Sequence, residues 1–258
     1  KASGHLAPGP PPAGHARAAA MPAASEQPWV VAVPSRDRAA SLGESTLALL
    51  LPSVPPERVF VFADPGQVGA YRAALEPLGV TVVSGEQGIC AQRNAIMRHF
   101  APGARIVEMD DDIKAVLVAH AAHKNDRSAK VRRMPTESFA AVVDRLWEAA
   151  DREGCSLWGV CPMRNPFYMA ATYTVGLVKC TAQLQGYVNL AEPVLLTVPV
   201  MEDYERCLQL YRRHLRSMRA DFLALSTVNR AKGGCAAYFA AGGPAGALHS
   251  LAPPPGAA

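Results

Sequence analysis

Residues 29–38 read WVVAVPSRDR, a short apolar run that is stopped by a proline and a serine. A run of this length with turn residues behind it is typical of a buried strand. Three more runs of the same kind follow, at residues 58–63, 80–83 and 105–109. Helical stretches separate the four runs, at residues 42–51, 68–78 and 89–100. Strands that alternate with helices in this way predict an α/β fold with a mostly parallel central sheet and helices on both faces.

The second half of the chain is less regular, and the pattern there predicts fewer elements. We expect helices at residues 136–152 and 203–216, and strands at residues 157–161, 173–178 and 222–228. The ends of the chain differ in composition from the middle, because residues 1–28 are rich in Ala, Pro and Gly and show no periodicity. We therefore predict a disordered leader at 1–28, an ordered domain at 29–247 and a disordered tail at 248–258.

Bulk composition narrows the class of protein only slightly. Half of the 258 residues are hydrophobic, and the net charge of +4 is compatible with a phosphorylated partner without requiring one. The six cysteines form no C-x-x-C pair, which favours buried, reduced thiols. We expect an intracellular protein, with the nucleus as the candidate compartment. No apolar run is long enough to cross a bilayer, so no membrane partner is predicted.

Polar residues follow the four predicted strands at the point where each strand ends. They are Ser35, Asp64, Gly85 and Asp110. Ligands of such sheets bind beyond the carboxyl ends of the strands. Asp64 could accept hydrogen bonds from a base or a ribose there, although a turn residue in Asp-Pro-Gly is an equally good interpretation. The chemistry of this chain is therefore expected at one edge of the sheet.

Three successive carboxylates, Asp110-Asp111-Asp112, come directly after the fourth apolar run. Their mutual repulsion has a cost unless a cation lies among them, and oxygen ligands suit Mg²⁺ or Mn²⁺ shared with diphosphate oxygens. In an extended segment the side chains of Asp110 and Asp112 point the same way, so we predict that this pair binds the metal. The alternative is an acidic loop or a helix cap.

The first half contains three motifs in a fixed order: Val33-Pro34-Ser35-Arg36-Asp37-Arg38, then Gly85-Glu86-Gln87-Gly88-Ile89 with Arg93-Asn94, then Val107-Glu108-Met109-Asp110-Asp111-Asp112. In this order and spacing they resemble a GT-A glycosyltransferase. The resemblance continues through Leu157-Trp158-Gly159-Val160, Asn165-Pro166-Phe167-Tyr168-Met169 and Glu202-Asp203-Tyr204-Glu205-Arg206. It covers about residues 29–243, and it is closest to the glycosyltransferases associated with the DNA-hydroxylating TET and J-binding oxygenases.

The resemblance implies a nucleotide-sugar half at residues 29–112 and an acceptor half at 113–247. The nucleotide would be bordered by Pro34, Ser35 and Arg36, and held by Arg93 and Asn94. Asp110 and Asp111 would face the donor diphosphate. From the residues alone, Arg93 on a helix at the carboxyl edge could pair with a phosphate, or it could be a solvated helix charge.

A second carboxylate pair, Glu202-Asp203, lies in the second half of the chain. Inverting glycosyl transfer needs a base that takes a proton from the acceptor hydroxyl. The resemblance places this base at Asp203 or Glu202, and we favour Asp203. The structural alternative is that both acids open a helix and interact with its dipole.

These expectations combine into one function, with alternatives. We predict a metal-dependent inverting glycosyltransferase that moves a hexose, glucose by the resemblance, from a UDP-sugar to a hydroxyl acceptor. The resemblance suggests hydroxymethylated pyrimidine in DNA as that acceptor, and five basic residues within 124–133 could contact its backbone or simply be solvated. The alternatives are transfer to a protein Ser or Thr, a nucleotidyltransferase, and a catalytically silent nucleotide-sugar-binding module.

Overall fold

The computed structural model describes residues 28–120, 125, 128–214 and 216–228. The leader predicted for residues 1–28, apart from Pro28, and the tail predicted for 248–258 lie outside the described residues. The same holds for residues 229–247 of the predicted acceptor half.

The centre of the fold is an eight-stranded sheet with the order β3-β2-β1-β4-β9-β7-β10-β8. Its strands are β1 Val30–Ser35, β2 Val59–Ala63, β3 Thr81–Ser84, β4 Arg105–Met109, β7 Leu157–Val160, β8 Tyr173–Gly176, β9 Leu184–Val188 and β10 Ser217–Ala220. Neighbouring strands are parallel from β3 through to β4, and again between β7 and β10. Only β9 and β8 run against their neighbours in this sheet. The prediction of a mostly parallel central sheet is confirmed.

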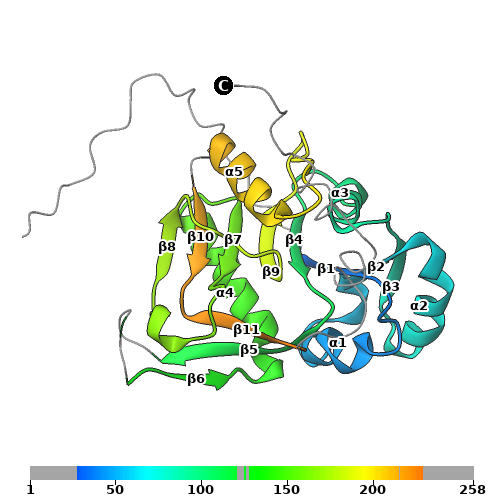
Figure 1. The fold of residues 1–258 in the computed structure, drawn as a ribbon, viewed down its shortest axis with the longest axis horizontal. Coiled ribbons are helices and arrows are strands. Elements are labelled where there is room, and N and C mark those ends of the chain that lie inside the picture. The colour runs from blue at the N-terminus through cyan, green and yellow to red at the C-terminus, as the bar shows by residue number, and fades with distance from the viewer. Residues whose placement is uncertain (1–27, 121–124, 126–127, 215, 229–258) are drawn as a thin grey trace, which may run out of the picture.

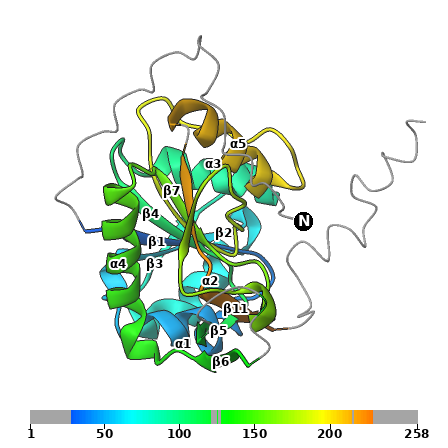
Figure 2. The ribbon, with the colours of Figure 1, turned by 90° about the vertical axis from the view of Figure 1, so that its left-hand side faces the viewer.

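Helices cover both faces of this sheet, as the alternating pattern predicts (Figures 1 and 2). One face packs against α1 Thr46–Leu50, α2 Val68–Leu75 and α4 Phe139–Arg152. The other face packs against α3 Ile89–His99 and α5 Glu202–His214. Figure 2 shows α4 on one side of the strands, with α3 and α5 on the other. Short 3-10 helices complete the connections, at Leu42–Glu44, Pro56–Arg58, Pro65–Gln67, Glu76–Leu78, Thr136–Ser138 and Pro166–Tyr168.

Side chains alternate between the two faces because successive residues of a strand point in opposite directions. Val31 and Val33 of β1 enter the core under α1, α2 and α4, while Ala32 between them faces α3 and α5. In β4, Val107 and Met109 belong to the first core and Ile106 to the second. Glu108 shares the face of Ile106 by the same rule, so a carboxylate lies in the layer between the sheet and helices α3 and α5.

A second sheet, with the order β11-β5-β6, lies along the lower edge of the molecule in Figure 1. It consists of β5 Ile113–His120, β6 Lys130–Arg133 and β11 Leu223–Thr227. The sequence analysis identified β11 but missed β5, β6, β9 and β10. It also assigned no strand to the basic segment 124–133, whereas residues 130–133 pair with β5 as a strand. Lys124 and Arg127 lie outside the described residues.

Gly186 of β9 leaves room for a buried tryptophan, and this yields a prediction. A Cβ atom at this position would lie 2.2 Å from Cε2 of Trp158, on the paired strand β7. The Trp158 ring cannot move away easily, because it is fully buried and packs edge-on against Trp147 at a centroid distance of 5.6 Å. We expect Gly186→Ala to lower the free energy of unfolding by about 1–3 kcal/mol, measured by urea denaturation.

The matched control is Gly69→Ala in α2, where a new Cβ would meet no atom within 4 Å. This change should be neutral or should stabilise the protein by up to about 1 kcal/mol, because alanine favours helix more than glycine does. Equal losses in the two variants would show that the contact with Trp158 is not the cause.

Candidate functional site

The four polar residues that were predicted at the ends of the first four strands lie at one edge of the sheet. β1, β2, β3 and β4 are parallel neighbours, so their carboxyl ends lie side by side. Ser35 ends β1, and Asp64, Gly85 and Asp110 directly follow β2, β3 and β4. This convergence is what the sequence predicts, and it places the candidate site between the strand ends and the first turn of α5.

The three carboxylates at 110–112 lie in a turn between β4 and β5. Thr46 donates a hydrogen bond to the carbonyl of Asp110 at 2.7 Å and accepts one from the backbone of Ile113 at 3.0 Å. Ser45 donates to the carbonyl of Asp111 at 2.9 Å. The prediction of an extended segment is wrong here, because the chain turns at once into β5 and the start of α1 holds the turn.

The Asp111 carboxylate is held by hydrogen bonds from other residues of the protein. Its carboxylate is buried and accepts hydrogen bonds from Ser35 Oγ at 2.6 Å and from Nη1 of Arg38. The same Nη1 lies 3.5 Å from Oδ2 of Asp112. Burial lowers the pKa of Arg38, but the neighbouring carboxylates outweigh burial and raise that pKa above its ordinary value. The sequence analysis quoted Arg38 in a motif without giving it a role, and it is the counter-ion of two of the three acids.

Arg93 joins the two carboxylate sites that are far apart in the sequence. Its Nη2 donates to Asp110 at 3.1 Å, its Nε donates to Glu202 at 3.1 Å, and its Nη1 donates to Glu108. The Arg93 side chain is only 3% exposed, so all three contacts are made away from solvent. The structure therefore brings Glu202 and Asp110 to one guanidinium, and binding of a donor phosphate by Arg93 stays a prediction that would require it to exchange partners.

Glu108 is the centre of a fully buried polar cluster. Its second oxygen accepts hydrogen bonds from Tyr187 at 2.9 Å and from Nη1 of Arg206 at 3.0 Å. The Arg206 guanidinium also lies over the Tyr187 ring, 4.3 Å from its centroid. Burial raises the pKa of Glu108, but Arg206 and Arg93 outweigh it and hold that pKa below its ordinary range. The sequence analysis missed this cluster, although a charge inside an apolar strand is a signal that a buried partner exists.

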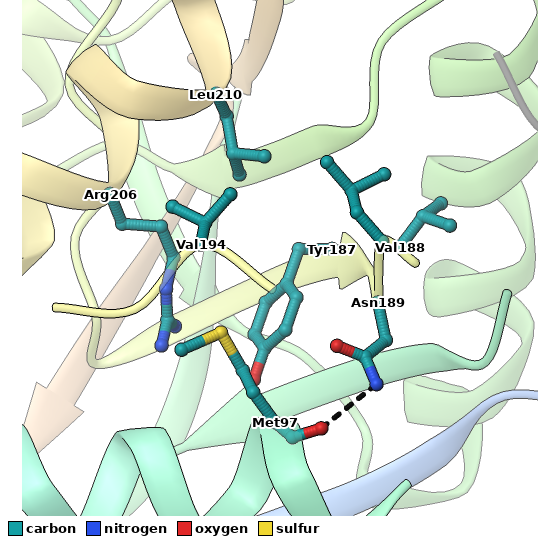
Figure 3. Close-up of a pocket in the computed structure, with 8 residues that line it drawn as sticks. Met97, Tyr187, Val188, Asn189, Val194, Arg206 and Leu210 are labelled. Atoms are coloured by element: carbon teal, nitrogen blue, oxygen red, sulfur yellow. Dashed lines mark hydrogen bonds between the residues drawn. The ribbon is translucent and has the colours of Figure 1, made fainter. Parts of the chain in front are cut away.

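A small cavity lies beside this cluster, between α3, β9 and α5 (Figure 3). Arg206 and Tyr187 line it, together with Asn189, which donates a hydrogen bond to the carbonyl of Met97 at 2.9 Å. Its volume of about 10 Å³ has room for roughly one water molecule. A nucleotide sugar is far larger than this cavity, so the donor cannot occupy it.

Electrostatics at the strand ends favour a cation. Burial raises the pKa of Asp110 to about 7; Arg93 opposes the shift, and Asp111 and Asp112 add to it. Burial also raises the pKa of Asp111 and of Asp112. The ion pairs form two neighbouring groups, and in each the carboxylates outnumber the guanidiniums. Arg38 pairs with Asp111 and Asp112, and Arg93 and Arg206 pair with Glu108, Asp110 and Glu202.

Metal binding by Asp110 and Asp112 stays a prediction that rests on the chemistry of their oxygens, because the chain turns at 110–112 and is not extended there. Both side chains are partly exposed, 28% and 21%, and they offer only oxygen ligands. Among the described residues, no three His, Cys, Asp or Glu side chains are grouped so that they could hold a metal unaided. Water or phosphate oxygens would therefore have to supply the other ligands, which is how Mg²⁺ is usually held.

Asp203 lies in the first turn of α5, one residue beyond Glu202. Its Oδ2 is 3.5 Å from Nζ of Lys179, its Oδ1 accepts a hydrogen bond from the backbone of Tyr204, and its side chain is 16% exposed. Met201, just before the helix, has a φ of 67°, a left-handed conformation that is uncommon outside glycine. Helix-terminus charge accounts for Glu202 and Asp203 equally well, so their part in proton transfer stays a prediction.

The remaining predicted residues divide into two kinds. Pro34 is buried in β1, and the Asn94 side chain makes two hydrogen bonds of 2.8 Å with the backbone of Leu196, so both hold the fold together. Arg36 and Asp64 stay at the edge, with Nε of Arg36 3.7 Å from Oδ2 of Asp64. Asp64 also accepts a hydrogen bond from Gly66 at 3.1 Å, as a turn residue does.

The similarity of this chain to known proteins lies in its fold. No family model matches the chain, and no curated protein matches it. Among solved structures, it is similar to the mannosyltransferase PcManGT from Pyrobaculum calidifontis in complex with GDP-Man and Mn²⁺, at 16% identity and a TM-score of 0.49. It is also similar to S. aureus TarS, at 15% identity and a TM-score of 0.48.

Each of these two alignments covers 78% of this chain, but the chain spans only 57% and 37% of those proteins. A third similar structure is 4-diphosphocytidyl-2C-methyl-D-erythritol synthase from Anaerococcus prevotii DSM 20548, at 10% identity and a TM-score of 0.42, with 78% and 92% of the two chains covered. Likeness at this level says nothing about the reaction. Within the part of the chain that the structure describes, no helix is both long and apolar enough to span a membrane.

Proposed function

We propose that this chain is a metal-dependent glycosyltransferase of the GT-A type, which transfers a hexose from a nucleoside diphosphate sugar to a hydroxyl acceptor. One observation carries the proposal. Arg93 joins Asp110 at the strand ends to Glu202 at the start of α5, and so places two separate acidic sites at one edge. Sugar transfer of this kind needs such a pair of sites, one for the leaving diphosphate and one for the attacking hydroxyl.

On the donor side, Asp110 and Asp112 would hold Mn²⁺ or Mg²⁺, which when bound neutralises charge on the leaving diphosphate. Arg36 and Asp64 are the predicted donor contacts whose side chains remain at the edge of the sheet. We assign Asp64 to the base or the ribose and Arg36 to the border of the nucleotide. Asp111, Ser35 and Arg38 act indirectly, because they hold the turn in which the two metal-binding carboxylates lie.

On the acceptor side, we assign Asp203 as the base. Its carboxylate takes the proton of the acceptor hydroxyl while that oxygen forms a bond to the anomeric carbon. The bond from this carbon to the diphosphate breaks, and the diphosphate leaves with the electron pair, so the anomeric configuration inverts. Nζ of Lys179 lies 3.5 Å from Oδ2 of Asp203 and forms an ion pair with it, which helps to fix the position of this carboxylate.

The finer assignments rest on the sequence resemblance. We propose UDP-glucose as the donor and hydroxymethylated pyrimidine in DNA as the acceptor. Such a base would have to leave the stack of the duplex to reach the strand ends. A protein Ser or Thr is the first alternative acceptor, because its hydroxyl needs the same base and the same donor site.

The test is product mass after incubation with Mn²⁺, UDP-glucose and a duplex that contains 5-hydroxymethylcytosine or 5-hydroxymethyluracil. We expect one added hexose per modified base, and its loss in Asp112→Asn. The matched control is Glu148→Gln on the exposed face of α4, which should keep full activity because Glu148 is 62% exposed and forms a surface ion pair with Arg145.

Three other outcomes separate the alternatives. Hydrolysis of UDP-glucose that needs metal, without modified DNA, would keep the donor site and reject the DNA acceptor. Release of pyrophosphate from a nucleotide would indicate a nucleotidyltransferase. Binding of UDP-glucose without turnover on any acceptor would indicate a silent binding module and overturn the proposal.

A further inference from the structure

Arg93 contacts three carboxylates, which lie on β4, in the turn directly after β4 and at the start of α5. Its Nη1 donates to Glu108 on β4 and lies 3.5 Å from the carbonyl of Ala182, while Nη2 donates to Asp110 and Nε to Glu202 on α5. The guanidinium carries its donors in a rigid planar fork, so these contacts fix its orientation. Arg93 therefore contacts both acidic sites at once, through Asp110 at the strand ends and through Glu202 at the start of α5.

Glu108 is the buried partner of the Arg93 guanidinium. Arg206 and Tyr187 hold its other oxygen, and all of these side chains are buried. Asp110 and Glu202 differ from Glu108, because their side chains are 28% and 13% exposed and lie at the edge. When the charge balance at the edge changes, the contact that yields is the one with Asp110, which is the more exposed of the two acids, while the buried contact with Glu108 stays.

We propose that Arg93 is a positioning residue that serves as a shared counter-ion for both carboxylate sites, and that it gives up Asp110 to a divalent cation while it keeps Glu202. This inference rests on the proposed function, because it takes the cation at Asp110 from it. A cation and a guanidinium compete for the same carboxylate, so Arg93 weakens cation binding in the resting protein. Coupling of this kind is reciprocal, so an occupied cation site tightens the hold of Arg93 on Glu202, next to Asp203.

The test is Mn²⁺ binding to the purified protein without donor or acceptor, measured from the electron paramagnetic resonance signal of free Mn²⁺. Arg93→Lys keeps the charge but cannot span three carboxylates. We expect it to bind Mn²⁺ about five- to tenfold more tightly, since Asp110 loses its competitor. A purely structural arginine would show the opposite sign, because a loosened site binds metal more weakly.

Arg206→Lys is the matched control, because Arg206 also contacts Glu108 but touches no acid at the edge. It should leave Mn²⁺ affinity unchanged or lower it. Adding Asp110→Asn to Arg93→Lys should remove the gain. Unchanged or weaker Mn²⁺ binding by folded Arg93→Lys overturns the proposal, and so does a wild-type protein that binds no Mn²⁺.

A second variant keeps the proposal testable if Arg93→Lys does not fold. Glu202→Gln leaves Arg93 with one acid fewer, so Asp110 is held more firmly and Mn²⁺ binding should weaken about fivefold. Glu205→Gln lies in the same turn but bonds to Thr197 and Val198 instead, and corrects for the loss of one negative charge. Equal effects of the two variants would refute the shared role of Arg93. Sugar transfer is not part of this readout, so a failed acceptor or donor assignment leaves the outcome interpretable.

Discussion

Glu108→Leu is expected to lower the free energy of unfolding by about 3–5 kcal/mol, which is a large part of the roughly 5–15 kcal/mol that stabilises a typical domain. The reason is the loss of the one carboxylate that Arg93 and Arg206 share in the core, where their side chains are 3% and 1% exposed. Arg93 keeps Asp110 and Glu202, but Arg206 has no other carboxylate within ion-pair distance among the described residues. A buried guanidinium without a counter-ion is far costlier than a missing surface pair.

The measurement is urea denaturation followed by circular dichroism, with the midpoint and slope compared between variants. Glu148→Leu on α4 is the control, since Glu148 is 62% exposed and its pair with Arg145 is a surface pair. That change should stay within about 0.5 kcal/mol of the parent protein. A loss below about 1 kcal/mol in Glu108→Leu would mean that water reaches the cluster and that the cluster does not hold α3 and α5.

Asp203→Asn is expected to reduce turnover at saturating donor and acceptor by about 10²- to 10⁴-fold, the usual contribution of a general base. The amide has nearly the same shape as the carboxylate but cannot accept the proton of the hydroxyl. Donor binding should be unchanged, because Asp203 contacts Lys179 and its own helix turn and no residue at the strand ends. Single-turnover transfer and equilibrium binding of UDP-glucose, measured on the same samples, separate these two effects.

Glu205→Gln is the control from the same helix turn, since Glu205 bonds to the segment before α5 and should change turnover little. Glu202→Gln decides which acid is the base. If it abolishes transfer while Asp203→Asn retains most of it, Glu202 is the base and Asp203 only stabilises the helix. Full activity in both variants would contradict the assignment of a base to this helix.

The first half of the fold could be predicted because its information is local. The apolar runs of β1 to β4 are short, each ends at a turn residue, and the helices between them have the length that a parallel crossover needs. The same pattern places Ser35, Asp64 and Asp110 at one edge, because parallel strands present their carboxyl ends together. The acidic turn and the start of α5 also stand out locally, as runs of carboxylates next to predicted elements.

The second half resisted prediction because its strands depend on distant partners. β9 is the sequence LQGYV, with a glutamine and a glycine in its interior, and it becomes a buried strand only between β4 and β7. Gly186 is useful there only because Trp158 needs the space. Likewise, the turn at Asp110–Asp112 is set by Ser45 and Thr46, which lie more than 60 residues earlier in the chain.

The sequence by itself therefore determined the α/β class, the edge where chemistry is expected and the acids that lie there. Only the tertiary structure decided how those acids are paired: Arg93 bonds to Glu202 across 109 residues, and Glu108 to Arg206 across 98. The physical reason is that periodicity and turn signals report on neighbours within a few residues. The partner of a buried charge is chosen instead by the packing of whole elements, here α3 and α5 against one face of the sheet.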